Sequence, residues 1–370
     1  MQSIECQDHL SNMQIITNLT ALPETLRGGA ISIGKFDGMH LGHSLIVQRL
    51  KSHAQHRQIP AILVTFDPPP VVVLRPDDHW KPLCTLERKI ELIRNFHVDA
   101  VVVIPTTREL LQQSAEAFFY ETVQNHFQAK VIVAGKDFSF GRDRVGTPDI
   151  IRLYGRWTGI EVDIVDPLQL GTERVSSSGI RQLLQAGQIE RVNELMPFPY
   201  RMTGTVIPGE QRGRTLGFPT ANLGNVRTIL PKQGVYATAT WIAGKQYGST
   251  THIGTNPTFN VSVPKIEVFA TAILKTLPEY SRLQKLVNEM PPWEGCPICT
   301  RLWHSACPAT RLPVSLSKTS LFGIITPVSL YCVVYVLKYR YRKRSSRCSS
   351  PNKTYRTVAA GGARRQRIRT

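Results

Sequence analysis

The chain has 370 residues, enough for two domains with their own cores, since a domain typically takes about 100–200 residues. Its formal charge of +18 resembles that of a nucleic-acid-binding protein, but residues 271–370 carry +15 of it, with 18 Lys and Arg against three Glu. The first 270 residues are nearly neutral, so the charge excludes no class of partner for the folded part.

The cysteines and the N-terminus indicate a cytoplasmic protein. Only Cys6 and Cys84 precede residue 271, which fits a reduced compartment and gives no disulfide framework. The opening MQSIECQDHLSNMQ contains acidic groups and lacks the long apolar core of a secretory signal.

Short apolar runs alternate with amphipathic stretches in the first half of the chain. The runs predict buried strands at AISI (30–33), AILVTF (61–66), AVVVI (100–104), KVIVA (130–134) and VDIV (162–165). The stretches between them, from SLIVQRLKSHAQ to DIIRLYGRW, have apolar residues at helical spacing. This alternation predicts an α/β fold with a mostly parallel sheet, helices on both faces, and ligands beyond the carboxyl ends of the strands.

The pattern changes near residue 197, after a small helical pair. The segments YRMTGTVI, GVYATATWI, QYGSTTHIG and KIEVFATAIL predict short strands with turns and no intervening helices, as in a small barrel or sandwich. After about residue 272 the apolar residues show neither the spacing of a helix nor that of a strand. We therefore predict an α/β domain over 1–196, a barrel over 197–272 and an atypical, disordered basic tail over 273–370.

Two histidines stand where the first strong strand passes into a helix, in AISIGKFDGMHLGH (30–43). With the helix starting near His40 or Leu41, His40 and His43 share one face of its first turn. The unpaired N–H groups of that turn favour an anion, and imidazoles there suit nucleotidyl transfer. Two ordinary surface histidines in a turn are the alternative.

Four motifs in this half resemble the adenylyltransferase half of bacterial bifunctional riboflavin kinase/FAD synthetases. They are GKFDGMHLGH, TFDPPP (65–70), VAGKDFSFGRDRVGT (133–147) and VSSSGIRQLL (175–184), in the order of that family. The resemblance implies a Rossmann-like nucleotidyltransferase domain that uses ATP to convert FMN into FAD. Pro69 departs from the His or Asn common there, and we expect weaker adenylylation from the loss of a polar contact.

The resemblance also gives the matching residues their roles. His40 and His43 would bind the ATP phosphates and stabilise the transition state, and Arg181 would clamp the triphosphate. The loop 135–142 would line the FMN pocket, with Phe138 and Phe140 available to pack on a ring; core packing is the alternative for both. With Phe138, the expected nucleotide- and flavin-binding residues also include Gly34, Phe36, Asp37, Gly42, Ser177, Ser178 and Asp137.

A second informative stretch is PGEQRGRTLGFPTANL (208–223). Its glycines permit a loop that brings backbone N–H groups onto phosphate, and Thr220 and Asn222 offer oxygen ligands for Mg²⁺. A plain Gly-rich turn before an edge strand is the alternative. The run resembles the riboflavin kinase signature of the same family, which implies nucleotide contacts at Gly213, Thr215 and Gly217.

The same resemblance implies a general base on a late strand. GVYA (234–237) and IGTNPTF (253–259) continue the match, and KIEVFATAIL puts Glu267 where the family has a glutamate that accepts the riboflavin hydroxyl proton. A strand-edge carboxylate facing water is the alternative. The resemblance ends at Leu274, which predicts a truncated barrel that lacks its last strand and leaves kinase activity in question.

The tail offers three weak patterns. Cys296, Cys299, His304 and Cys307 have zinc-ligand types, but their last gap is short for a zinc knuckle. Residues 319–337 are uncharged and precede a basic run, although Pro327 weakens a membrane span. The abrupt change of composition is typical of a shifted reading frame or a fusion.

The function predicted from these motifs is the conversion of riboflavin to FMN and then to FAD, with ATP and Mg²⁺ and release of pyrophosphate in the second step. The expected partners are riboflavin, FMN and ATP, with no nucleic acid and no membrane; a weak homo-oligomer is left open. The first alternative is an adenylyltransferase with a non-catalytic flavin-binding remnant of the kinase. The second is a non-enzymatic protein that acts on membranes or nucleic acid through its tail.

Overall fold

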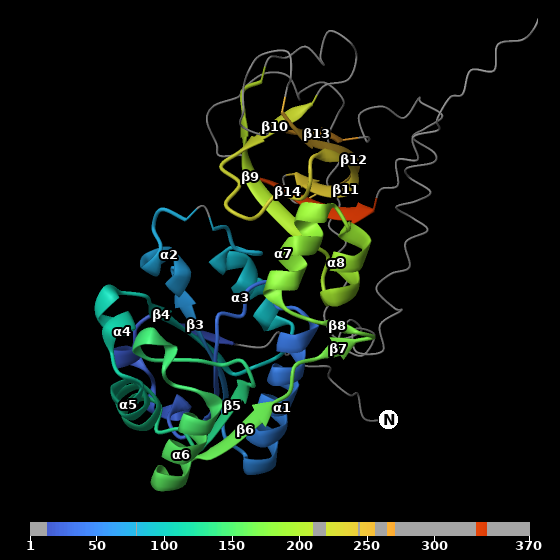
Figure 1. Ribbon diagram of the computed structural model, residues 1–370. Coiled ribbons are helices and arrows are strands. Elements are labelled where there is room, and N and C mark those ends of the chain that lie inside the picture. The colour runs from blue at the N-terminus through green and yellow to red at the C-terminus, as the bar shows by residue number, and fades with distance from the viewer. Residues whose placement is uncertain are drawn as a thin grey trace, which may run out of the picture. The chain divides into compact units, whose positions relative to one another are not determined.

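The computed structural model describes residues 13–78, 80–209, 220–242, 245–255, 265–270 and 331–338. Within these residues, a parallel sheet with helices on both faces is followed by an antiparallel barrel (Figure 1). Both architectures were predicted from the sequence. One further unit, residues 340–370, lies outside the described residues.

The parallel sheet has six strands in the order β1-β4-β3-β2-β5-β6. Its strands are β1 (Gln14–Ile16), β2 (Ala30–Ile33), β3 (Ala61–Asp67), β4 (Ala100–Pro105), β5 (Val131–Gly135) and β6 (Glu161–Val165). The five longer strands are those expected, within one residue at each end, and β1 is an additional short edge strand. β2 is buried throughout, and β3 and β4 are buried except at their carboxyl ends, as their continuous apolar runs require.

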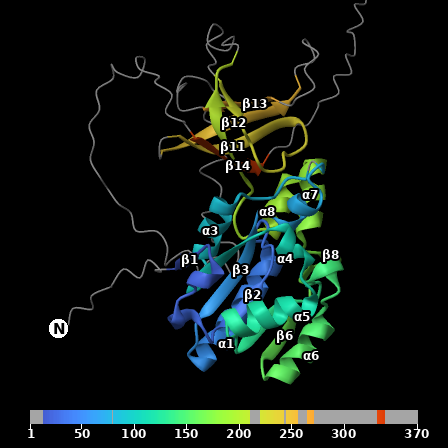
Figure 2. The same ribbon diagram turned by 90° about the vertical axis from the view of Figure 1, so that its left-hand side faces the viewer.

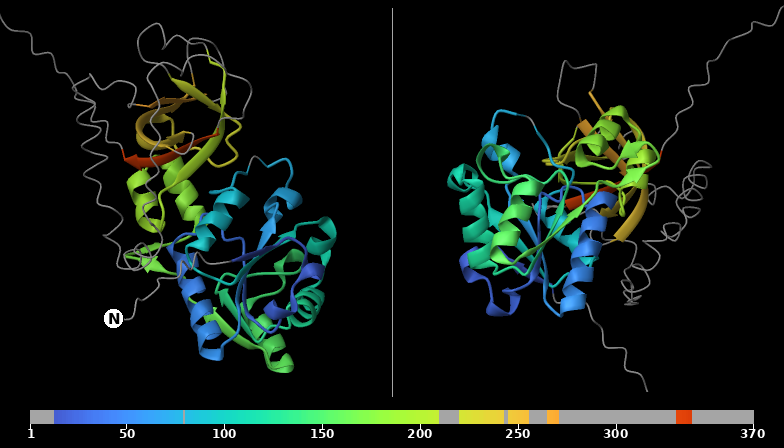
Figure 3. Two further views of the ribbon diagram at one scale, coloured as in Figure 1. Left: turned by 180° about the vertical axis from the view of Figure 1, so that it is seen from behind. Right: turned by 60° about the horizontal axis from the view of Figure 1, so that its bottom comes forward.

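Helices cover both faces of this sheet (Figures 1 and 3). On one face, α1 and α3 pack through Val47, Leu50 and Leu92. On the other, the segment from α5 to η3 packs through Phe118, Phe119 and Val123, together with α6. The helices are α1 (Leu41–Arg57), α2 (Pro70–Leu74), α3 (Leu86–Arg94), α4 (Arg108–Gln112), α5 (Ala115–Phe118), the π-helix η3 (Phe119–His126) and α6 (Pro148–Thr158).

Short elements complete this part of the chain. They are the 3-10 turns η1 (Leu19–Ala21), η2 (Glu24–Leu26) and η4 (Arg142–Arg144), the hairpin of β7 (Gln169–Leu170) and β8 (Glu173–Arg174), and the helical pair α7 (Ser177–Ala186) and α8 (Ile189–Leu195).

Strand β2 is the point at which the strand order of the sheet reverses. It pairs with β3 on one side and with β5 on the other, and all of these pairs are parallel. Ligands of open α/β sheets bind at such a switch point, beyond the carboxyl ends of the strands. The helix that follows β2 is α1, so its N-terminus lies at this position.

The barrel has six strands in the closed order β10-β13-β12-β11-β14-β9 (Figure 2). These are β9 (Arg201–Ile207), β10 (Ala221–Gly224), β11 (Gly234–Ile242), β12 (Lys245–Gly254), β13 (Lys265–Ala270) and β14 (Tyr331–Lys338). Hydroxyl groups fill part of its interior: Thr238 Oγ1 is bonded to Ser249 Oγ at 2.7 Å and to Thr251 Oγ1 at 2.9 Å.

The last strand corrects one expectation. The sequence predicts a barrel open for want of a final strand, yet β14 pairs with β11 through residues 332–338 and with β9 through residues 331–335. This strand comes from the tail that was expected to be disordered. Residues 331–337 of this strand also fall within the uncharged run 319–337, so this part of the run is a strand and not part of a membrane helix.

Candidate active sites

The two histidines of the first motif lie at the start of α1. His40 is the N-cap residue, and its Nδ1 accepts the backbone N–H of His43 at 3.3 Å. The imidazole rings stack with their centroids 3.7 Å apart. Gly42 permits this stack, because a Cβ there would lie 3.2 Å from the His40 ring. The H-x-G-H spacing thus brings both rings to the unpaired N–H groups of the first helical turn.

Both imidazoles are neutral near pH 7. Burial lowers the pKa of His40 to about 4, and burial together with the nearby His40, Lys89 and Lys35 lowers the pKa of His43 well below its usual value. Because His40 Nδ1 is an acceptor, its proton lies on Nε2, which can donate to a ligand. Within the described residues, the buried Nδ1 of His43 has no hydrogen-bond partner.

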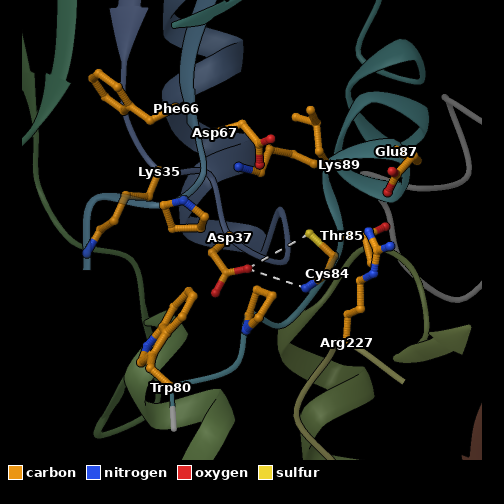
Figure 4. Close-up of a pocket in the computed structure, with 13 residues that line it drawn as sticks. Lys35, Asp37, Phe66, Asp67, Trp80, Cys84, Thr85, Glu87, Lys89 and Arg227 are labelled. Atoms are coloured by element: carbon orange, nitrogen blue, oxygen red, sulfur yellow. Dashed lines mark hydrogen bonds between the residues drawn. The ribbon is translucent and has the colours of Figure 1, made fainter. Parts of the chain in front are cut away.

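A buried carboxylate organises the loop beside the histidines. Asp37 is 6% exposed and accepts the backbone N–H group of Cys84 at 3.3 Å (Figure 4). It also accepts the backbone N–H of Leu83 at 2.9 Å and forms an ion pair with Arg181. The Arg181 guanidinium also lies 4.7 Å from the centroid of the Trp80 ring. Burial raises the pKa of Asp37, and the charge of Arg181 opposes that rise. The predicted triphosphate clamp is therefore already held in place by its neighbours.

The other residues expected to shape the nucleotide site lie around this pair. Phe36 has a φ of +46° and presents its ring to the edge of His43 at 5.3 Å. Gly34 leaves room for that ring, since a Cβ there would lie 3.2 Å from it. Ser177 donates its hydroxyl to the backbone oxygen of Asp37 at 3.0 Å, while Ser178 is exposed in the first turn of α7. The motifs separated by 140 residues thus meet at one point.

The loop after β5 divides into an exposed and a buried part. Asp137 forms an exposed ion pair with Arg174 at 2.8 Å. Phe138 stacks on Phe140 with centroids 5.4 Å apart, but Phe140 is buried and packs against Phe118. Phe140 is a core residue, so the expectation that it is available to a flavin ring is wrong. Phe138 is half-buried and stays a candidate.

In the barrel, strand register places three polar residues in one row. Glu267 on β13 is opposite Asn222 on β10 and opposite His252 on β12. Directly opposed residues point to the same face of a sheet, so all three share one face. Glu267 Oε2 lies 3.9 Å from His252 Nδ1. The expected base and one expected Mg²⁺ ligand are therefore neighbours.

The start of the glycine-rich segment lies against this row. A Cβ on Gly209 would lie 1.9 Å from the side-chain nitrogen of Asn222, so a side chain there would force Asn222 to move. Thr220 is exposed just before β10. The expected nucleotide contacts at Gly213, Thr215 and Gly217 lie outside the described residues.

Comparison with known proteins finds relatives of both parts of the chain. The FAD synthetase family model matches residues 22–179, and the riboflavin kinase model matches residues 196–283. The bifunctional riboflavin kinase/FMN adenylyltransferase of Haemophilus influenzae is 31% identical over 283 residues, which cover 75% of this chain and 92% of that protein. The protein of the same name from Listeria monocytogenes is 37% identical over 236 residues, 62% of this chain and 73% of its own length.

The chain belongs to the bifunctional riboflavin kinase/FMN adenylyltransferase family. It is a riboflavin kinase and an FMN adenylyltransferase, whose products are FMN and FAD. The kinase match extends to residue 283, past Leu274 where the sequence resemblance was expected to end. A Streptococcus pneumoniae structure described as a macrolide-efflux protein has the same fold, with a TM-score of 0.64 and 22% identity over 90% of this chain and 93% of that one.

Three residues of the first site were not found from the sequence. Trp80 contacts Arg181, Cys84 accepts the N–H of Gly38 at 3.2 Å, and Lys89 lies buried at the adjoining cavity. A buried lysine or cysteine on a helical or loop segment carries no local signal of its own. Only the pairing of distant segments reveals these three.

Membrane-spanning helices and metal-ligand clusters can be assessed only in the described part of the chain, which includes residues 331–338 of the tail. None of the helices there has the length and apolar character needed to cross a bilayer. The same residues contain no group of three His, Cys, Asp or Glu side chains arranged to hold a metal ion. The Cys296–Cys307 cluster lies outside the described residues.

Proposed function

We propose that the stacked histidines carry the adenylyl transfer and that the barrel row carries the phosphorylation of riboflavin. The observation that supports the first assignment is the pair of neutral rings at the N-terminus of α1, at the switch point of the sheet. The buried Nδ1 of His43 and the N–H groups of the first turn of α1 can both bind a polar ligand, and ATP phosphates fit them.

In the transfer step, a phosphate oxygen of FMN attacks the α-phosphorus of ATP. The bond from that phosphorus to the bridging oxygen breaks, and pyrophosphate leaves with the electron pair. No protein nucleophile is needed, so the site positions the phosphates and stabilises the charge that develops on them. His40 would donate from Nε2, and Arg181 would exchange part of its contact with Asp37 for a phosphate oxygen.

In the kinase step, Glu267 would accept the proton of the terminal ribityl hydroxyl as that oxygen bonds to the γ-phosphorus of ATP, and ADP leaves. Mg²⁺ fits the oxygen donors of Thr220 and Asn222, because it prefers hard oxygen ligands together with phosphate and water. When bound, it would neutralise charge on the phosphates. The close contact of Gly209 with Asn222 supports a backbone approach to this ligand set.

We further propose that both steps take place in the cytoplasm. ATP and reduced thiols are available there, and the Cys84 thiol is buried with its pKa raised to about 12 by desolvation, so it is inert as a thiol. The family's substrates riboflavin, FMN and ATP complete the set of partners.

The decisive experiment compares His43→Ala with Glu267→Gln in purified full-length protein. His43→Ala should lower FAD formation from FMN and ATP by about 10²–10³-fold, the usual cost of one transition-state donor, and change FMN formation less than twofold. Glu267→Gln should lower FMN formation by about 10²–10⁴-fold and spare FAD formation. A fall of both activities in either variant would contradict the division of labour.

A further inference from the structure

A buried lysine lies at the cavity beside the histidine site. Lys89, on α3, is 5% exposed, and its Nζ donates to the hydroxyl of Thr65 on β3 at 3.0 Å. The cavity that it lines has a volume of about 170 Å³ and is also lined by Lys35 and Asp37. Figure 4 shows the Lys89 side chain extending from its helix toward the middle of this pocket and toward Asp67.

Its hydrogen bond to Thr65 satisfies only part of this ammonium group. A lysine ammonium has three donors, and burial of an incompletely paired charge is costly. Among the described residues, no carboxylate oxygen approaches Nζ within the 4 Å of an ion pair. Of the acids that line the cavity, Asp37 is already engaged by Arg181 and by two backbone N–H groups, and the others, Asp67 among them, are exposed. The chain therefore maintains a buried cation that its own acids do not neutralise by contact.

The positive charge of the Lys89 ammonium affects a pKa in the histidine site. Desolvation lowers the pKa of Lys89, and the positive charge of Lys89 in turn contributes to the low pKa of His43. The two groups are thus close enough to share an electrostatic environment. Because both histidines are neutral and Arg181 is partly offset by Asp37, the further positive charge for the phosphates of a bound nucleotide comes from the lysines that line the cavity, Lys35 and Lys89.

We propose that Lys89 binds a substrate phosphate group next to His43 during adenylyl transfer. The inference rests on the function proposed for the histidine site and adds to it the buried positive charge. The phosphate is that of FMN or the α-phosphate of ATP; both are anionic phosphate oxygens that satisfy the free ammonium donors. Thr65 accepts one donor of the ammonium, which leaves two donors for the phosphate, and Lys89 is a binding residue of the reaction.

The test compares Lys89→Met with Thr65→Val in the full-length protein. Lys89→Met keeps an unbranched side chain one atom shorter and removes the charge, and it should lower kcat/KM of FAD formation by about 10²-fold. Thr65→Val removes the tie to β3 and keeps the ammonium, and it should stay within threefold of the original protein. Lys51→Met on α1 is the matched lysine control, and riboflavin phosphorylation should remain within twofold throughout.

The kinetic pattern identifies the phosphate. A raised KM for FMN assigns the FMN phosphate, a raised KM for ATP assigns the nucleotide, and a lower kcat with both KM values unchanged assigns the α-phosphate in the transition state. The proposal is overturned if Thr65→Val loses as much activity as Lys89→Met, or if Lys89→Met stays within threefold.

Two further variants keep the test decisive. If Lys89→Met lowers the unfolding temperature so far that both activities fall, Lys89→Arg restores the charge; a gain of at least tenfold in FAD formation over Lys89→Met supports the proposal, and equal activity overturns it. His43→Ala is measured in parallel. Undiminished FAD formation in that variant would refute the histidine site itself, an outcome distinct from failure of the lysine.

Discussion

The two sites of this protein are built in different ways. The histidine site is assembled from buried groups on α1, α3 and α7, with Asp37 holding Arg181 and two backbone N–H groups at once. The barrel row is half-exposed and is aligned by strand register alone, from Asn222 through Glu267 to His252. The first site depends on local desolvation and packing, and the second depends on every strand of the barrel staying paired.

The largest effect that this difference predicts comes from shortening the tail. A chain ending at residue 330 lacks β14 and leaves β9 and β11 with unpaired edges, whereas a chain ending at residue 339 keeps the barrel closed. FMN formation should fall at least tenfold in the shorter chain, with FAD formation changed less than twofold. Both rates are measured on the two purified chains. Equal kinase rates would show that β14 is dispensable.

Acid should destabilise the domain that carries the histidine site. The pKa of His40 is about 4 in the folded protein and about 6.5 in the unfolded chain, so the folded state binds fewer protons between these values. Its contribution is fully present above pH 6.5 and is lost as the pH falls toward 4. The loss amounts to roughly 3 kcal/mol of unfolding free energy.

The measurement is urea unfolding of the α/β domain at pH 7 and pH 4, in the original protein and in His40→Asn. The asparagine keeps a helix-capping side chain and removes the titrating ring. The variant should lose less stability on acidification, because the carboxylates common to both proteins cancel in the comparison. The exposed His56→Gln is the control and should follow the original protein.

The sequence was sufficient to predict those parts of both regions that depend on residues close together along the chain. The start of α1 at Leu41, the strands of the sheet and the histidine pair all follow from local spacing and capping. The contact of Arg181 with Asp37 and that of Lys89 with Thr65 join different elements, so no local pattern contains them. The order of the motifs predicted that Arg181 lies near the site, but it did not predict the ion pair with Asp37.

The final strand, β14, is a second feature that depends on residues far apart in the chain. YCVVYVLK (331–338) is apolar enough for a strand, but it lies within a longer uncharged run, and its partners β9 and β11 are about 90 residues or more earlier in the chain. Pairing over such a separation is not readable from periodicity. The tail's change of composition obscured it further.

In the barrel, the close packing of Gly209 against Asn222 can be disturbed without changing Asn222 itself. Gly209→Ala would put a Cβ 1.9 Å from the side-chain nitrogen of Asn222 and so displace an expected Mg²⁺ ligand. We expect FMN formation to fall about tenfold, the cost of roughly 1.4 kcal/mol, with FAD formation unchanged. Gly234→Ala is the matched control, because a Cβ there meets Tyr236 at an ordinary 3.7 Å. Equal rates in the two variants would argue against Asn222 as a ligand.

The smallest effect concerns the stacking of Arg181 on Trp80 in the histidine site. A guanidinium over an indole face at a partly exposed position contributes about 0.5–1 kcal/mol, and here it orients the clamp that ATP must engage. Trp80→Leu should therefore raise the KM for ATP in FAD formation about two- to fivefold and leave kcat nearly unchanged. Steady-state kinetics with varied ATP measure this, with the exposed Trp157→Leu as control. A lowered KM would mean instead that the indole holds Arg181 away from the nucleotide, so that the ring restrains the clamp before ATP binds.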